Sequence, residues 1–150
     1  MSEKNLVLVQ HFYEDVFTAG KMNSAAIDQY LAADFVGHDL PPGLNGREGF
    51  KKFVGMLAAS FSDTTRIEAH EIIGNGDKIV VRWSSTGRHT GEFMGIPATG
   101  QRITLKGIDI FRLAEGKIAD LWQEMDMLGI LQQISGPLPG ESSVEEVYRC

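Results

Sequence analysis

Two polar side chains interrupt the apolar face of a predicted β-hairpin late in the sequence. In "ITLKGIDIFRL", residues 103–113, the odd positions are apolar or glycine except for Asp109. In "KIADLWQEM", residues 117–125, Gln123 interrupts the same alternation. Because successive side chains of a strand point to opposite faces, Asp109 and Gln123 both project toward the apolar side. Apolar surroundings raise the pKa of a carboxyl group and an amide N–H stabilises an oxyanion, so the pair suits proton transfer on a carbonyl compound.

The loop between the two strands decides how these side chains face each other. A three-residue loop, Ala114–Gly116, keeps odd positions opposite odd ones and sets Leu121 opposite Asp109. Gln123 is then diagonal to Asp109, within roughly 7–8 Å. A two-residue loop would pair odd positions with even ones and mix the two faces. The hydrophobic alternation therefore favours the three-residue loop.

Side chains from the neighbouring strands extend this face into a predicted pocket. In "KIVVRWSSTGRH", residues 78–89, the odd positions are mostly apolar and even positions include Lys78, Arg82 and Arg88. The predicted apolar walls are Ile67, Val81, Leu105, Phe111, Leu121 and Met125, and the predicted polar groups are Asp109, Gln123, Trp83, Ser85 and, from a loop at the mouth, His38. An apolar cavity with a few convergent polar groups is the usual form of a small-molecule site.

Structural explanations for the same residues stay open. Asp109 can be a structural acid satisfied by backbone or arginine partners, although an unpaired buried carboxylate costs several kcal/mol. Gln123 can be a packing residue, and Trp83 can belong to the core while it lines the cavity. His38, flanked by Gly37 and Asp39, is the histidine best placed for chemistry.

The remaining histidines are less promising, and metal-binding patterns are missing. His11 is expected on a helix surface, His70 on the outer face of a strand, and His89 near the pocket rim. The sequence has no HExxH motif, no histidine pair four residues apart and no phosphate-binding loop. Neither a metal nor a cofactor is therefore predicted, and Cys150 has no context for a nucleophile.

The elements that position these residues divide the chain into a helical half and a strand half. Apolar residues at three- and four-residue spacings predict helices around residues 6–17, 24–31 and 48–61, the second capped by Asn23 or Ser24. "FVGHDLPPGLNG" is predicted as a loop. Strands follow at 64–73, 78–89 and in the hairpin, with a short helix at 126–134. This order predicts an α+β domain, a curved antiparallel sheet wrapped around three N-terminal helices with a central pocket.

Composition and charge narrow the class of protein. The 150 residues fit one domain, 1–150, with a core at about 4–135 and a tail at 136–150 that is expected to dock on a partner subunit. The net charge is −6 without a basic cluster, so nucleic acid is not an expected partner. Apolar runs are too short for a membrane span, and no signal sequence is apparent. Cys150 is the only cysteine. Together these features predict a cytoplasmic protein.

Two longer stretches resemble the SnoaL-like polyketide cyclase family. They are "HTGEFMGIPATGQRITLKGIDIFRLAEGKIADLWQEMDMLGILQQI" and "FVGHDLPPGLNGREGFKKFV", and the likeness extends over about residues 4–135. The resemblance implies the cone-shaped α+β barrel shared with ketosteroid isomerase and scytalone dehydratase, a homodimer or homotetramer, and cofactor-free acid–base chemistry. It also implies that the acid/base Asp of the founding cyclases, which close a ring by aldol condensation, falls on Gln123 and that their assisting His falls on Asp109.

These observations lead to one main functional hypothesis and two alternatives. The main hypothesis is an acid–base enzyme of cyclase or isomerase type acting on a small apolar carbonyl or polyketide-type compound. Asp109 transfers the proton, Gln123 and Trp83 stabilise the oxyanion and His38 shuttles or orients a proton. The alternatives are a hydrolase similar to epoxide hydrolases, which needs two pocket carboxylates, and a small-molecule-binding protein without turnover.

Overall fold

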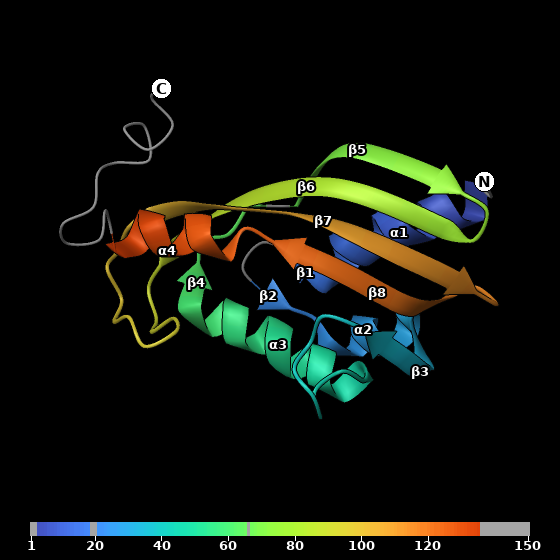
Figure 1. Cartoon of the computed structure of the whole chain (residues 1–150), viewed down its shortest axis with the longest axis horizontal. Helices are drawn as coiled ribbons and strands as arrows, with labels where there is room; N and C mark the ends of the chain where they lie inside the picture. Colours follow the sequence, from blue (N-terminus) through green and yellow to red (C-terminus); the bar gives the residue numbers. More distant parts are fainter. Residues whose placement is uncertain (1–2, 19–20, 66, 136–150) are drawn as a thin grey trace, which may run out of the picture.

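The computed structural model describes residues 3–18, 21–65 and 67–135 of the chain (Figure 1). The predicted tail at 136–150 lies outside this range. In chain order the elements of the first half are α1 (Glu3–Val16), β1 (Phe17–Thr18), β2 (Lys21–Met22), α2 (Ser24–Tyr30), β3 (Leu31–Gly37), α3 (Arg47–Ser60) and β4 (Phe61–Ser62). The second half contains β5 (Glu68–Asn75), β6 (Lys78–His89), β7 (Arg102–Ala114), β8 (Lys117–Met125) and α4 (Met127–Ser135).

The main sheet is mixed, whereas the sequence predicted an antiparallel sheet. Its strand order is β3-β8-β7-β6-β4, with β5 also paired to β6. β3 runs parallel to β8, and Gly37 pairs with Leu121. The sequence predicts a helix that includes Leu31 and a loop over residues 35–46, where the structure has β3. Burial along β3 does not follow a strict period of two, because Ala33 is exposed between the buried Leu31 and Phe35, and the partner strand is more than 80 residues away.

The sheet is strongly curled, and the helices pack against its inner side (Figure 1). α1 buries Val9, Phe12, Tyr13 and Val16, which recur at helical spacing along one face. α3 runs beside β3 and β4 and buries Phe50 and Val54. This arrangement confirms the predicted cone-shaped α+β fold, in which helices close a curved sheet around an apolar interior.

The start of α2 agrees with its predicted cap. Asn23 precedes the helix in an extended conformation, and its side-chain oxygen accepts a hydrogen bond from the backbone N–H of Ala26 at 3.3 Å. Such a cap satisfies one of the backbone donors that the first helical turn leaves without a partner. The helix then ends at Tyr30, where the chain becomes extended and begins β3.

The β7–β8 hairpin has a two-residue turn and a bulge instead of the predicted three-residue loop. Ala114 pairs with Lys117, so the turn consists of Glu115 and Gly116, both with positive φ (52° and 76°). A two-residue turn alone would mix the faces, but the register shifts beyond Leu113, where two residues of β8 oppose one of β7. The bulge restores the alternation. As a result, Asp109 pairs directly with Gln123.

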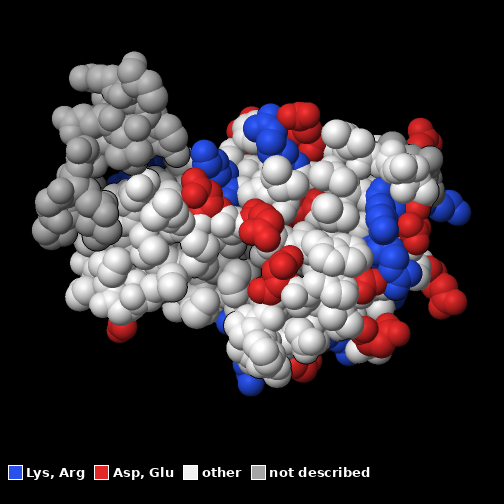
Figure 2. All heavy atoms as spheres, in the orientation of Figure 1, with Lys and Arg blue, Asp and Glu red and all other residues white. Residues whose placement is uncertain are grey.

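The surface view shows charges of both signs distributed over one face of the molecule. In Figure 2, Lys and Arg side chains lie among Asp and Glu side chains. This face does not carry the concentrated positive patch that binding to a phosphate backbone requires. Within the described ranges, no helix has the length and apolar character needed to cross a membrane.

Candidate active site

Asp109 lies in the middle of β7, on the inner side of the sheet, and is almost completely buried. Its side chain is 2% exposed. The hydroxyl of Tyr13, on α1, donates a hydrogen bond to Oδ2 at 2.6 Å. The side-chain amide of Gln123, on β8, donates to Oδ1 at 3.0 Å. The carboxylate is therefore held from two sides by uncharged donors.

The surroundings of Asp109 raise the pKa of its carboxyl group to about 6. Burial is the dominant cause, since an apolar environment disfavours the charged form. Hydrogen bonds from Tyr13 and Gln123 act in the opposite direction by stabilising the carboxylate. A carboxyl group with a pKa near neutrality can both take and return a proton under physiological conditions.

Trp83, on β6, provides a buried donor without a partner. Its indole N–H also acts to lower the pKa of Asp109. Nε1 is buried, however, and no acceptor among the described residues lies at hydrogen-bonding distance and angle from it. An unpaired buried N–H beside a cavity is costly, and a ligand oxygen would satisfy it.

Gly107 leaves space for the Trp83 ring. A Cβ atom at position 107 would lie 2.9 Å from one indole carbon and 2.6 Å from the backbone oxygen of Glu124. Because Gly107 pairs with Trp83 across β6 and β7, only glycine lets the ring lie this close to the neighbouring strand.

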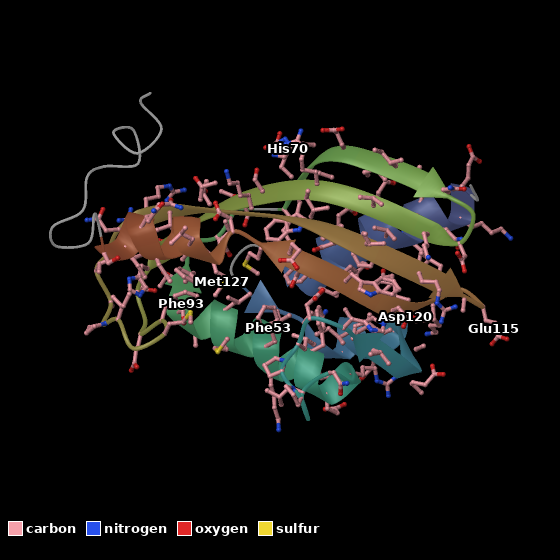
Figure 3. The ribbon with its side chains drawn as sticks, in the orientation of Figure 1. Phe53, His70, Phe93, Glu115, Asp120 and Met127 are labelled. Atoms are coloured by element: carbon pink, nitrogen blue, oxygen red, sulfur yellow. The ribbon has the colours of Figure 1, made fainter. Side chains whose placement is uncertain are left out.

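These groups line a cavity between the sheet and the helices. The polar atoms lie among aromatic and aliphatic side chains. The lining residues are Phe12, Tyr13, Phe17, Phe50, Phe53, Val54, Leu57, Ala58, Phe61, Thr64, Thr65, Ile67, Trp83, Ser85, Leu105, Asp109, Leu121, Gln123 and Met125. Figure 3 shows Phe53 on the side of α3 that faces the sheet. The cavity has the apolar character of a small-molecule site.

Two predicted wall residues do not reach the cavity. Val81 and Phe111 point to the inner side of the sheet, as expected, but both are fully buried and neither is a lining residue. The ring of Phe111 packs against those of Phe12 and Tyr13, at 5.7 Å between centroids in each case. α1 thus covers this part of the sheet. The other predicted wall residues (Ile67, Leu105, Leu121 and Met125) line the cavity, and so do the predicted polar groups Trp83 and Ser85.

His38 lies on the outer face of the sheet, which corrects its predicted position at the pocket mouth. His38 directly follows the end of β3 at Gly37, and its side chain lies against Asp120 and Trp122, which alternate with the inward-facing Leu121 along β8. The ring of His38 stacks on that of Trp122, with 4.5 Å between the ring centroids and an angle of 3° between the ring planes. Its Nε2 lies 2.8 Å from Oδ1 of Asp120. His38 is not among the described residues that line the cavity.

The other histidines are also outside the cavity. His70 lies on β5 and contacts the Ser84 hydroxyl at 2.6 Å (Figure 3). His89 is fully buried rather than near the rim, and its Nδ1 accepts a hydrogen bond from the backbone N–H of Thr99 at 3.2 Å. Over the described ranges, no cluster of three or more His, Cys, Asp or Glu side chains could hold a metal ion.

Tyr13 is a site residue that the sequence pattern does not single out. It lies within the helix predicted around residues 6–17, and in the structure it belongs to the buried face of α1. A tyrosine on such a face carries a hydroxyl that needs a partner when it is buried. That requirement was the available signal, but the partner, Asp109, is 96 residues away in the sequence.

Comparisons with known proteins show what this chain is similar to in sequence. The family model described as SnoaL-like polyketide cyclase matches residues 7–134. The aklanonic acid methyl ester cyclase DnrD of Streptomyces peucetius is 34% identical over 111 residues, which cover 74% of this chain and 75% of the relative. The nogalonic acid methyl ester cyclase of Streptomyces nogalater is 29% identical over 127 residues, covering 83% and 93% of the two chains.

A solved structure gives the same fold. TsrD from Streptomyces laurentii superimposes with a TM-score of 0.77 and 29% sequence identity, covering 89% of this chain and 97% of that one. The similarity therefore includes both the helical half and the sheet.

Proposed function

Because the chain belongs to the SnoaL-like polyketide cyclase family, we propose that it is a cyclase-type acid–base enzyme that works without a cofactor. Its substrate is a small, largely apolar carbonyl or polyketide-type compound. The observation that carries this proposal is the Asp109 carboxylate, 2% exposed on the wall of an apolar cavity, with a pKa raised to about 6. The unpaired indole N–H of Trp83 lies on the same wall.

In the proposed reaction, Asp109 takes a proton from the carbon next to a substrate carbonyl. The C–H electron pair becomes the enolate, and Trp83 donates its N–H to the developing oxyanion. The enolate carbon then attacks a second carbonyl of the same molecule and forms the new C–C bond. The alkoxide that results takes the proton back from Asp109, so the cycle needs neither an oxidant nor an added acid.

Gln123 has a supporting role in this scheme. The resemblance implies an acid/base Asp at its position, but an amide does not transfer protons at neutral pH. Gln123 instead donates one N–H to Asp109. Its second N–H is available to the substrate oxygen. The proton-transfer carboxylate thus lies on β7 rather than on β8.

The cavity favours this function over the hydrolase alternative. A hydrolase similar to epoxide hydrolases uses two carboxylates, and among the described cavity residues only Asp109 has one. Binding without turnover is left as an outcome of the experiment. The assembly state, a homodimer or homotetramer, and the cytoplasmic location stay predictions from the sequence.

Asp109→Asn tests the proposal, with aklanonic acid methyl ester as the probe because it occurs in the names of relatives. Deuterium uptake from D₂O at the enolisable carbon, followed by mass spectrometry, reports proton abstraction even when ring closure fails. We expect Asp109→Asn to lower the exchange rate by about 100-fold or more. The wild-type rate should rise with pH through about 6, where the carboxyl group ionises.

His38→Gln is the matched control, because the structure places His38 outside the cavity. Its exchange rate should stay within about twofold of wild type, the range expected for a surface change. Exchange by Asp109→Asn at the wild-type rate would refute the assignment. Tight binding of the ester to the wild-type protein without exchange would favour the non-catalytic alternative.

A further inference from the structure

Tyr13 is held rigidly where α1 meets the sheet. Its ring lies 5.6 Å from the ring of Phe12, 6.3 Å from that of Phe17 and 5.7 Å from that of Phe111, measured between centroids. The side chain is only 7% exposed. Aromatic packing of this kind fixes the ring orientation, so the hydroxyl cannot swing away from Asp109 without disturbing the core.

The direction of the Tyr13–Asp109 hydrogen bond follows from the state of the phenol. Burial, followed by the negative charge of Asp109, raises the pKa of Tyr13 well above its usual value. The phenol therefore keeps its proton and donates to Oδ2, and Gln123 donates to Oδ1. Both contacts favour the ionised carboxylate, because a carboxylate accepts from two donors at once.

The helix and strands that face Asp109 supply no positive charge that would keep its carboxylate ionised. Tyr13 faces it from α1, Trp83 from β6 and Gln123 from β8, and all three are uncharged. No Lys or Arg occurs among the described cavity residues. The ionised state therefore depends on neutral donors, of which Tyr13 is at the shortest distance, 2.6 Å.

We propose that Tyr13 is a positioning residue for the reaction, which fixes the Asp109 carboxylate through Oδ2 and keeps it in its proton-accepting form. This inference rests on the proposed function, in which Asp109 takes the substrate proton. Tyr13 acts through Asp109 and transfers no proton itself. Loss of its hydroxyl should therefore change the pH at which the enzyme works.

The test is Tyr13→Phe, which keeps the ring and removes only the hydroxyl. The carboxyl ¹³C chemical shift of Asp109, assigned by comparison with Asp109→Asn, is followed as a function of pH. We expect the titration midpoint to rise by about one pH unit above the wild-type value. The pH profile of deuterium exchange should move by the same amount, so that the rate recovers toward wild type at high pH. A purely structural role would lower the rate equally at every pH.

Tyr30→Phe is the matched control. Tyr30 is also a buried tyrosine that donates to a carboxylate, Asp15, but it does not line the cavity. It should leave the Asp109 midpoint unchanged. An unchanged midpoint in Tyr13→Phe would overturn the inference even when Asp109→Asn abolishes exchange. A raised midpoint together with full activity of Asp109→Asn would refute the proposed function instead, while the effect of Tyr13 on Asp109 would stand.

Discussion

The buried carboxyl group of Asp109 should stabilise the folded protein less at neutral pH than at acidic pH. Its pKa is about 6 in the folded state and 3.8 in the unfolded reference. A group whose pKa is raised on folding contributes stability below its unfolded pKa and loses it as the pH rises through its folded pKa. The difference of roughly two pH units corresponds to about 3 kcal/mol.

Asp109→Asn removes this dependence and keeps the shape of the side chain. The amide oxygen of the variant side chain can take the place of Oδ2 and accept from Tyr13, and the Gln123 amide can turn so that its oxygen accepts from the new NH₂ group. The difference in unfolding free energy, variant minus wild type, should therefore increase between about pH 4 and pH 6.5. It should then level off, about 3 kcal/mol above its acidic value. Urea denaturation followed by circular dichroism at several pH values measures this difference.

A substitution at the surface, whose effect on stability should depend on pH in the opposite direction, serves as the control. A hydrogen bond from Lys51 lowers the pKa of the exposed Asp28. The contribution of Asp28 to stability is present above the pKa that it has in the unfolded chain, and it is lost as the pH falls through the lower pKa that it has in the folded protein. The variant-minus-wild-type difference for Asp28→Asn should therefore decrease as the pH rises from acid. A flat or falling curve for Asp109→Asn would mean that its donors outweigh burial, and the reasoning about Asp109 would be wrong.

Two further substitutions examine the surroundings of the carboxylate. Gly107→Ala should destabilise the protein by about 1–3 kcal/mol, because the new Cβ meets the Trp83 ring at 2.9 Å and a backbone oxygen at 2.6 Å. Thermal unfolding measures this loss of stability. In the control Gly46→Ala the new Cβ meets nothing within 4 Å, and the change should cost only about 1 kcal/mol, the usual cost of alanine at a helix N-cap. Gln123→Glu should place a second carboxyl group beside Asp109, so that one proton is shared and the exchange-rate midpoint moves to higher pH; an unmoved midpoint would show that the two groups do not interact.

The alternation of residue types was sufficient to place Asp109 and Gln123 on the inner face. A strand has a period of two, and a carboxylate among apolar neighbours stands out from that pattern without any knowledge of the partner strands. The same rule put Trp83, Ser85, Leu105, Leu121 and Met125 toward the interior, and all of them line the cavity. The family likeness supplied the cone-shaped fold.

The tertiary structure decided the pairing register of the strands and the packing of α1 on the sheet. Asp109 and Gln123 are directly paired because a bulge follows the two-residue turn, and its position depends on how both strands pack. His38 faces outward because β3 pairs with a strand more than 80 residues away. Tyr13 reaches Asp109 only because α1 packs on the curled sheet. Local periodicity tells which face a side chain takes, but contacts between distant segments depend on the packing of the whole core.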